Sequence, residues 1–325
     1  MKILLKIIMN SLLFVISENQ WYDKIRKMKK PISTTLFLLL TALPCFCIDN
    51  FSFSIAPRAS VTFGTLEEIV YDSPNGDAEI ISLLEWEQKP LIDIGLSAAL
   101  QYNHFIFSTG FDYSFPIKTS YMSDYDWDWG ELDSYTKHPI LSSKNICTEL
   151  SVGHEINISP KLSVIPAIQF DYIYNSFEAD RGSGVRGGRK IRGYGIDYTR
   201  HSFFTFTGLA VKAELTSRFF LTAEFYTALW SHQVCEDYHH GVKNPFTTIE
   251  AHDGYFKKYK ARVSTGYNFN KLISLELFSQ FIFGFPDTGT FSSDKSTDKI
   301  EPVTSQKGGS AIHSAKFGTS LKFTF

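Results

Sequence analysis

The stretch from Ser274 to Phe283 reads SLELFSQFIF. Its polar residues Ser274, Glu276 and Gln280 stand at alternate positions, and apolar residues fill most of the places between them. Side chains alternate between the two faces of an extended chain, so this pattern predicts a β-strand with one apolar face. The same alternation recurs in FSFSI at 51–55, FFLTAEF at 219–225 and LKFTF at 321–325, and no stretch has a convincing helical period.

The composition narrows the class of protein. Of 325 residues, 15% are aromatic, 43% are apolar and only 20% are charged. The mean hydropathy of −0.10 is too polar for a bundle of membrane helices. The net charge of −2 argues against a nucleic-acid partner, which requires a basic excess. A transmembrane β-barrel has this composition, because only the lipid-facing half of each strand is apolar.

Two kinds of connection separate the predicted strands. Four short turn signals, at 102–104, 159–161, 216–218 and 268–270, alternate with five long polar stretches, at 66–78, 123–144, 178–191, 231–252 and 286–309. We therefore predict a ten-stranded antiparallel transmembrane barrel with short periplasmic turns and long extracellular loops. A soluble β-sandwich is the alternative. The barrel is favoured because the segments 90–100, 105–116 and 161–177 reach or exceed the roughly 9–11 residues of a tilted membrane strand.

The first fifty residues have the pattern of an export signal. A basic segment at 28–30 precedes an apolar run at 32–43, which is short for a membrane helix of about 20 residues. We predict a signal peptide over 28–47, an upstream segment 1–27 that precedes the true start of translation, and an outer-membrane barrel over 48–325.

Two cysteines, Cys147 and Cys235, remain after such a signal peptide. An exported chain can oxidise a pair of cysteines to a disulfide. The spacing does not distinguish a disulfide from two free thiols, and both interpretations stay open.

Two carboxylates lie close together where the third predicted strand enters its long polar stretch. Asp124 and Asp126 are two residues apart, so both project to one face of an extended chain. Carboxylates this close share a proton or a water, which raises one pKa and suits the pair to polarising a water molecule. Taken alone, an acidic solvated loop is the simpler interpretation.

A second pair lies where the seventh predicted strand enters its long stretch. Asp237 and His239 are also two residues apart, and a carboxylate next to an imidazole orients it as a general base. Histidines alone in a loop, or a metal site from His232, His239, His240 and His252, are alternatives, although the spacing matches no standard zinc pattern.

In a ten-stranded barrel the third and seventh strands face each other across the lumen. A groove between them would have the Asp124–Asp126 pair on one wall and the Asp237–His239 pair on the other. A water held there would be a nucleophile for an amide carbonyl, with no serine or cysteine nucleophile required.

These motifs resemble the omptin family of outer-membrane endopeptidases, over nearly all of the predicted mature chain. Asp124-Tyr125-Asp126-Trp127 is similar to the first omptin motif, D-x-D-W, and Asp237 with His239 after Trp230 is similar to the second, D-x-H. The remaining similarities are FGTL at 63–66, Glu68, VY at 70–71, LEW at 84–86, TKHP at 136–139 (with Thr136 where a serine is usual) and the ending LKFTF at 321–325.

The resemblance implies an outer-membrane protease with its active site facing the exterior. His239 would be the general base and Asp237 its orienting partner, while Asp124 and Asp126 would position the water. Peptides or proteins would be the substrates and membrane lipid the surroundings. We expect a monomer with no metal and no other cofactor, although omptins are known to need lipopolysaccharide as an activator.

Two residues bear on specificity. Omptins cut next to basic residues, and Glu68 matches one of the acidic residues that bind them. Cys235 stands where a second acid is expected, and a thiol does not replace a carboxylate for binding Lys or Arg. We therefore predict a weaker or altered preference for basic residues. An inactive barrel that acts as an adhesin or structural protein is the alternative function. A porin is disfavoured because side chains fill so narrow a lumen.

Overall fold

The computed structural model describes residues 51–325, except 74–78, 117–119, 241–243 and 296–298. The predicted signal peptide and the segment upstream of it lie outside the described residues. Within the described ranges, no helix is long and apolar enough to cross a membrane. The strands are β1 (Phe51–Tyr71), β2 (Ile80–Tyr102), β3 (Phe105–Pro116), β4 (Tyr121–Asp128), β5 (Glu131–His154), β6 (Ile156–Ser159), β7 (Leu162–Ala179), β8 (Ser183–Arg186), β9 (Arg189–Arg192), β10 (Gly195–Glu214), β11 (Phe219–His240), β12 (Phe246–Gly254), β13 (Lys258–Asn268), β14 (Ile273–Gly284), β15 (Asp287–Ser293), β16 (Glu301–Pro302) and β17 (Lys307–Thr324).

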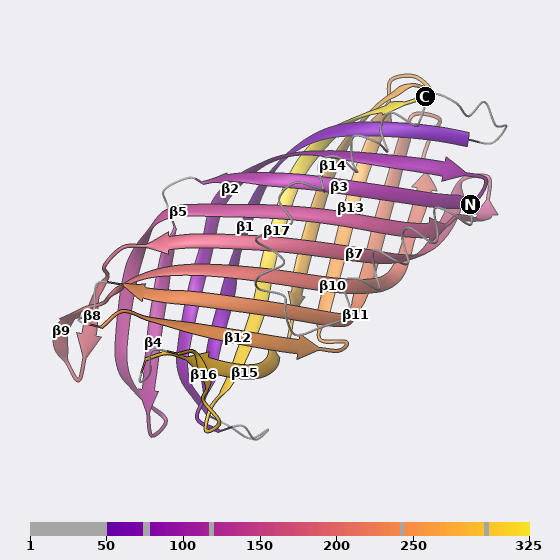
Figure 1. Cartoon of the computed structure of the whole chain (residues 1–325). Helices are drawn as coiled ribbons and strands as arrows, with labels where there is room; N and C mark the ends of the chain where they lie inside the picture. The colour runs from indigo at the N-terminus through magenta and orange to yellow at the C-terminus, as the bar shows by residue number, and fades with distance from the viewer. Residues whose placement is uncertain (1–50, 74–78, 117–119, 241–243, 296–298) are drawn as a thin grey trace. The chain divides into compact units, whose positions relative to one another are not determined.

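The strands close into a barrel of ten antiparallel rows in the described part of the chain (Figure 1). β3 pairs with the lower part of β2 and β4 with its upper part, so β3 and β4 form one row. β13 with β12, and β14 with β15, form interrupted rows in the same way. β1 pairs with β17 from Ser54 opposite Thr324 to Tyr71 opposite Lys307, which closes the ring. The prediction of a ten-stranded barrel is confirmed, and the pairing of β1 with β17 leaves neither of these two strands as an open edge of the ring.

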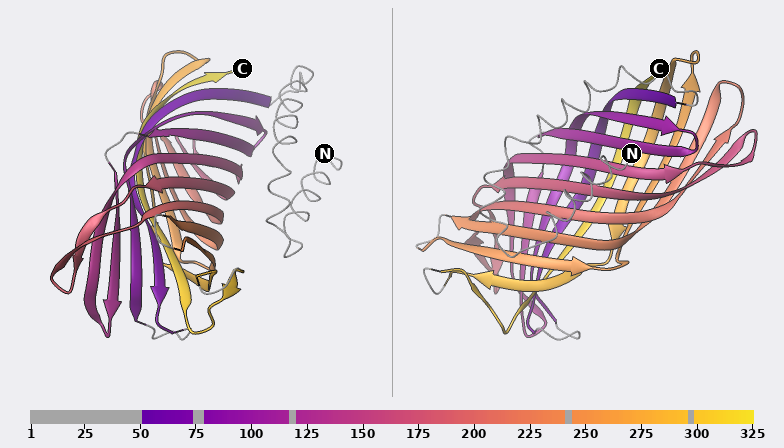
Figure 2. Two further views of the ribbon diagram at one scale, coloured as in Figure 1. Left: turned by 60° about the vertical axis from the view of Figure 1, so that its left-hand side comes forward. Right: turned by 45° about the vertical axis from the view of Figure 1, so that its right-hand side comes forward.

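The near and far walls cross at a steep angle in both views of Figure 2. Strong tilt is the geometry that lets a sheet of this size close on itself. The four predicted short turns join β2 to β3, β6 to β7, β10 to β11 and β13 to β14. Asn103, in the first of these turns, has the positive φ of 53° that asparagine tolerates better than most residues.

At the opposite end of the barrel, the strands extend further than the five long polar stretches of the sequence indicate. Much of the five long polar stretches is continued strand, including β4, β8, β9, β12, β15 and β16, which gather at this end (Figure 1). The hairpin from β4 to β5 turns at Trp129 and Gly130, both with positive φ. Above the bilayer the outer face of a strand meets water, so its residues need not alternate in polarity. The pattern therefore resembles that of a loop although the hydrogen-bonded ladder continues.

Apolar side chains cover the outside of the lower barrel. Ile92, Ile94 and Leu96 on β2 are 43%, 51% and 49% exposed, and β3 presents Phe107, Phe111 and Phe115 in the same alternating way. Such a band on the outer face is the lipid-contacting surface of a transmembrane barrel.

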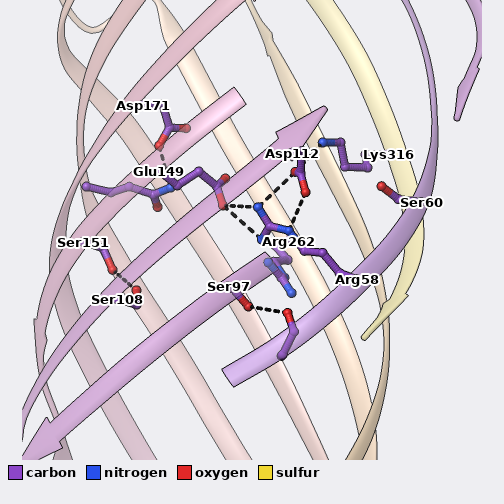
Figure 3. Close-up of polar contacts among 12 residues, drawn as sticks. Arg58, Ser60, Ser97, Ser108, Asp112, Glu149, Ser151, Asp171, Arg262 and Lys316 are labelled. Atoms are coloured by element: carbon purple, nitrogen blue, oxygen red, sulfur yellow. Dashed lines mark hydrogen bonds and ion pairs between the residues drawn. The ribbon is translucent and has the colours of Figure 1, made fainter. Parts of the chain in front are cut away.

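Buried ion pairs cross the lumen inside this band (Figure 3). Arg58 bonds Asp112 at 2.6 Å and approaches Glu149 at 3.4 Å. Lys260 bonds both Glu149, at 2.6 Å, and Asp171, at 2.9 Å. A polar cavity of about 440 Å³ extends from this network towards the short turns. Charged side chains from opposite walls thus meet across the lumen of the lower barrel.

Candidate active site

The first acidic pair stands on β4, and the neighbouring strand β5 supplies a hydroxyl to each carboxylate. In the antiparallel register Asp124 lies opposite Thr136, and Asp126 lies opposite Ser134. Ser134 Oγ donates a hydrogen bond of 2.7 Å to Asp126 Oδ2, and Thr136 Oγ1 lies 3.5 Å from Asp124 Oδ2. The β-ladder itself therefore positions both carboxylates.

A buried histidine lies behind Thr136. Nδ1 of His138 lies 3.0 Å from the carbonyl oxygen of Asp180, and Nε2 lies 2.7 Å from Thr136 Oγ1. A carbonyl only accepts, so Nδ1 carries the proton and Nε2 accepts the hydroxyl proton of Thr136. Burial lowers the pKa of His138, which keeps the ring neutral. The Thr136 hydroxyl thus lies between the ring of His138 and the carboxyl group of Asp124.

The second pair stands on β11. His239 Nε2 lies 3.1 Å from Asp237 Oδ2, and Thr248 on β12 donates to Asp237 Oδ1 at 2.7 Å. The ring of Phe246 stacks on the imidazole with centroids 4.2 Å apart and an interplanar angle of 11°. Asp237 is only 2% exposed, so its carboxylate is held in place by these contacts rather than by water.

The barrel brings the two pairs within electrostatic range of each other. Burial, and after it the neighbouring Asp126, raise the pKa of Asp124 to about 7. His239 acts on the same carboxyl in the opposite direction, and Asp237 adds to the rise. Residues more than a hundred positions apart in the chain thus influence one carboxyl group at the upper end of the barrel.

The histidines named as a metal alternative do not converge. His232 pairs with Asp253 at 3.0 Å at a partly exposed position, whereas His252 is fully buried and pairs with Glu250 at 2.8 Å. Among the described residues, no group of three or more His, Cys, Asp or Glu side chains has an arrangement that can hold a metal ion.

The model of the omptin family matches residues 49–325. The chain belongs to the omptin family. This omptin has the fold of the outer membrane protease OmpT from Escherichia coli, with a TM-score of 0.74 and 17% identity over 86% of this chain and 98% of that one. The outer membrane protein OprG from Pseudomonas aeruginosa matches with a TM-score of only 0.35 and 6% identity, over 84% and 95% of the two chains. No curated protein matches the sequence.

Family membership makes this omptin an outer-membrane protease. The two pairs stand at the end of the barrel opposite the four short turns, where strands rise beyond the apolar band. The predicted location in the outer membrane is confirmed by the family.

The two predicted specificity residues of the omptin lie below the Asp237–His239 pair. Glu68 on β1 is 3% exposed and lies opposite Ser310 on β17. Cys235 is 1% exposed; its Sγ accepts a hydrogen bond of 3.2 Å from the Tyr198 hydroxyl and lies 3.9 Å from Ser310 Oγ. Both described cysteines, Cys147 and Cys235, are free thiols, which settles the disulfide question left open by their spacing.

Three neighbours of the site were not identified from the sequence. Thr248, Phe246 and Glu250 all lie on β12, within a stretch predicted to be a loop. A hairpin pairing of β11 with β12 sets Thr248 opposite Asp237 and Glu250 opposite Cys235. Only that register reveals their proximity, and a stretch without alternating polarity gives no register signal.

Proposed function

We propose that this omptin hydrolyses peptide bonds of extracellular proteins or peptides with a water molecule activated by His239. The observation that supports the proposal most directly is that one carboxyl group, Asp124, is influenced electrostatically by Asp126 on its own strand and by His239 and Asp237 on the seventh row. A carboxyl that holds a proton near neutral pH, facing an imidazole with a carboxylate partner, is a combination suited to general acid–base chemistry.

In this proposal His239 is the general base. The ring nitrogen that faces Asp237 carries the N–H, so the other nitrogen is free to accept a proton from water. Thr248 holds Asp237, and Phe246 restricts the tilt of the imidazole. General-base catalysis of this kind contributes about 10²–10⁴-fold to a rate.

The aspartate pair supplies one negative charge and one proton. The ionised carboxylate accepts a hydrogen bond from the water and holds it beneath the substrate carbonyl. The protonated carboxyl donates a hydrogen bond to the oxyanion that forms there. Because burial and Asp126 raise the pKa of Asp124 to about 7, Asp124 is the member that keeps the proton.

The reaction then balances without an intermediate that is covalently bonded to the enzyme. The water oxygen bonds to the carbonyl carbon while its proton passes to His239. When the tetrahedral intermediate collapses, the C–N bond breaks and His239 returns the proton to the leaving nitrogen. One water is consumed, and a carboxyl group and an amine are formed.

The substrate preference depends on the charge below this site. Glu68 supplies a carboxyl group, but Cys235 does not supply a second, because burial raises the pKa of its thiol to about 11. With Glu68 acting alone, the preference for basic residues is weaker or altered. We further propose that the omptin acts as a monomer and needs lipopolysaccharide as an activator.

The test is cleavage of a peptide panel by the full chain refolded in detergent with lipopolysaccharide. Asp124→Ala and His239→Ala should each abolish cleavage while the barrel keeps its heat-modifiable mobility on a gel. His240→Ala is the matched control, since His240 is the next residue on β11 and pairs with Asp197 at 3.3 Å at an exposed position. A wild-type chain that cleaves nothing, or variants as active as the wild type, would instead support the inactive adhesin.

A further inference from the structure

The hairpin of β8 and β9 carries a cluster of positive charge at the end of the barrel that bears the candidate active site (Figure 1). Its sequence, SGVRGGRKIR at 183–192, contains four cations and no acidic residue, in a chain whose net charge is −2. The side chains of all four cations are exposed. The proposed reaction makes no use of this positive charge.

This hairpin is a regular antiparallel ladder. β8 and β9 pair over their full length, and β8 pairs on its other side with β5. The turn between them consists of Gly187 and Gly188, both with the positive φ that a two-residue turn of type I′ requires. The register of the ladder therefore determines on which face each charged side chain lies.

The base of the hairpin packs on the histidine behind Thr136. A Cβ added to Gly182 would lie 2.6 Å from Cγ of His138, and one added to Gly193 would lie 2.5 Å from its Nε2. The amide of Gly193 also donates a hydrogen bond of 3.2 Å to the carbonyl oxygen of Gly182. The hairpin is thus in direct contact with a residue that adjoins the aspartate pair.

One row of the ladder leads from the aspartate pair to the tip of the hairpin. Asp126 lies opposite Ser134, which in turn lies opposite Arg186. Arg186 lies opposite Arg189. Directly opposite residues of an antiparallel ladder have their side chains on the same face. Arg186 and Arg189 therefore project from the face that carries Asp126, towards the substrate groove.

The other two cations of the hairpin project from its opposite face. Lys190 follows Arg189 directly, and Arg192 is two residues beyond Lys190. Side chains alternate along a strand, so Lys190 and Arg192 share the outer face of β9.

The two arginines on the groove face have too few acidic partners. Like charges at directly opposite positions of an antiparallel pair destabilise it. Arg186 bonds Asp133 at 2.8 Å, but the Arg186 side chain is 66% exposed, and an exposed pair contributes little. Arg189 has no hydrogen-bond or ion-pair partner among the residues that the structure describes. A second anionic group between the two guanidinium groups would relieve their repulsion.

We propose that Arg186 and Arg189 form an exosite, a binding surface outside the catalytic groups, for an acidic segment of the peptide substrate. The proposal rests on the proposed protease function. Arg189 lies three strand spacings of about 4.8 Å from Asp126, about 14 Å in all. An extended peptide rises about 3.3 Å per residue, so acidic residues about four or five positions from the cleaved bond reach the arginine pair. Guanidinium groups bind such carboxylates in bidentate geometry.

The position of the arginine pair favours a peptide over a lipid headgroup. Lipid surrounds the outer face of a barrel, which is the side of Lys190 and Arg192. Arg186 and Arg189 instead share a row with the aspartate pair. The exosite supplies a selectivity that does not depend on Cys235, where an acidic residue is missing.

The experiment uses two sets of peptides, each with one scissile bond that the full chain cleaves. A peptide carries two glutamates or two glutamines at the fourth and fifth positions from that bond, on the N-terminal side in one set and on the C-terminal side in the other. At low ionic strength and fixed lipopolysaccharide, we expect about fivefold higher kcat/KM for the glutamate peptide of one set, as two exposed charge contacts provide. The difference should lie in KM, because a remote contact is equal in the ground and transition states.

Two double variants compare the two faces of the hairpin. Arg186→Gln with Arg189→Gln should reduce the glutamate-to-glutamine ratio to below about twofold. Lys190→Gln with Arg192→Gln is the matched control, because it removes the same charge from the outer face, and it should leave the ratio unchanged. Added salt at 0.5 M should lower the wild-type ratio, since it screens exposed charges.

Three outcomes of these assays overturn the proposal. The first is a wild type without preference for glutamate in either set, and the second is an equal loss of the ratio in both double variants. The third is a groove-face variant that keeps the ratio but needs more lipopolysaccharide for activity, which would assign the arginine pair to lipid phosphate.

A binding measurement separates the exosite from the protease function. Fluorescence anisotropy of the labelled glutamate and glutamine peptides is followed with the Asp124→Asn chain, alone and combined with Arg186→Gln and Arg189→Gln. Tighter binding of the glutamate peptide that is lost with the two arginines supports the exosite even if wild type cleaves nothing. Equal binding of the glutamate and glutamine peptides to the Asp124→Asn chain refutes it, whatever the cleavage assay shows.

Discussion

The hydroxyl of Thr136 lies 2.7 Å from Nε2 of the fully buried His138. The same hydroxyl oxygen lies 3.5 Å from Oδ2 of Asp124. A single hydroxyl on β5 therefore connects a buried histidine with the acidic pair on β4.

Thr136→Val should lower kcat about twofold to tenfold, since a hydrogen bond between neutral groups contributes about 0.5–1.5 kcal/mol. Thr136→Ser keeps the hydroxyl and should stay within about threefold of wild type. The pH profile of kcat decides between a positioning role and a structural one. Valine should shift the profile, because it removes the hydroxyl that contacts the Asp124 carboxyl group. An unshifted profile with lower kcat would show that Thr136 acts through packing alone.

The stability of the barrel should depend on pH through Asp124. Its pKa is raised from 3.8 in the unfolded chain to about 7, so the folded state binds more protons between these values. Stability due to this group is therefore lost as pH rises through the window, by at most about 4 kcal/mol. Asp124→Asn removes that loss and should raise the unfolding midpoint at pH 8 more than at pH 5. An equal effect at both pH values would contradict the raised pKa.

The thiol of Cys235 should be dispensable for chemistry. Burial raises its pKa to about 11, so almost no thiolate forms at neutral pH. Cys235→Ala should retain cleavage within about threefold, and iodoacetamide should not inactivate the wild type at pH 7.5. Loss of activity in either experiment would mean that the thiol takes part in the reaction.

The lumenal ion pairs should be sensitive to the loss of one partner. Arg58→Met leaves Asp112 and Glu149 without this cation, and removing one member of a buried pair costs about 3–5 kcal/mol. Lys89→Met provides the comparison, because its pair with Glu87 is largely exposed and contributes about 0–1 kcal/mol. Urea unfolding in detergent, followed by gel mobility, measures both. Equal unfolding midpoints for the two variants would contradict the expected difference in stability between losing a buried ion pair and losing an exposed one.

Much of the barrel follows from the sequence, because a membrane requires strict alternation. The outward positions of SLELFSQFIF, Leu277 and Phe281, are exposed to lipid, and Gln280 faces inward. The positions of the short turns follow from residues such as Asn103. The shared face of Asp124 and Asp126 follows from the period of two along any strand.

The surroundings of the site could not be predicted in the same way. Thr248 and Glu250 reach their partners through the register of β11 with β12, which depends on where an unpatterned polar hairpin turns. The continuation of the strands into the long polar stretches could not be predicted, because water on the outer face removes the alternation of polar and apolar residues that marks a strand. Cross-strand pairing, rather than residue type, decides what surrounds Asp237.

The ion pairs that cross the lower lumen also affect how substrates enter the barrel and how products leave it. Arg58, Lys260 and their acidic partners bond to one another across the interior. These side chains occupy part of the lumen below the site, so we expect both halves of a cut chain to leave by the opening through which the intact chain arrived. Turnover then depends on how fast products and new substrate exchange at the extracellular opening of the barrel. The fragments would then return to the surroundings of the cell.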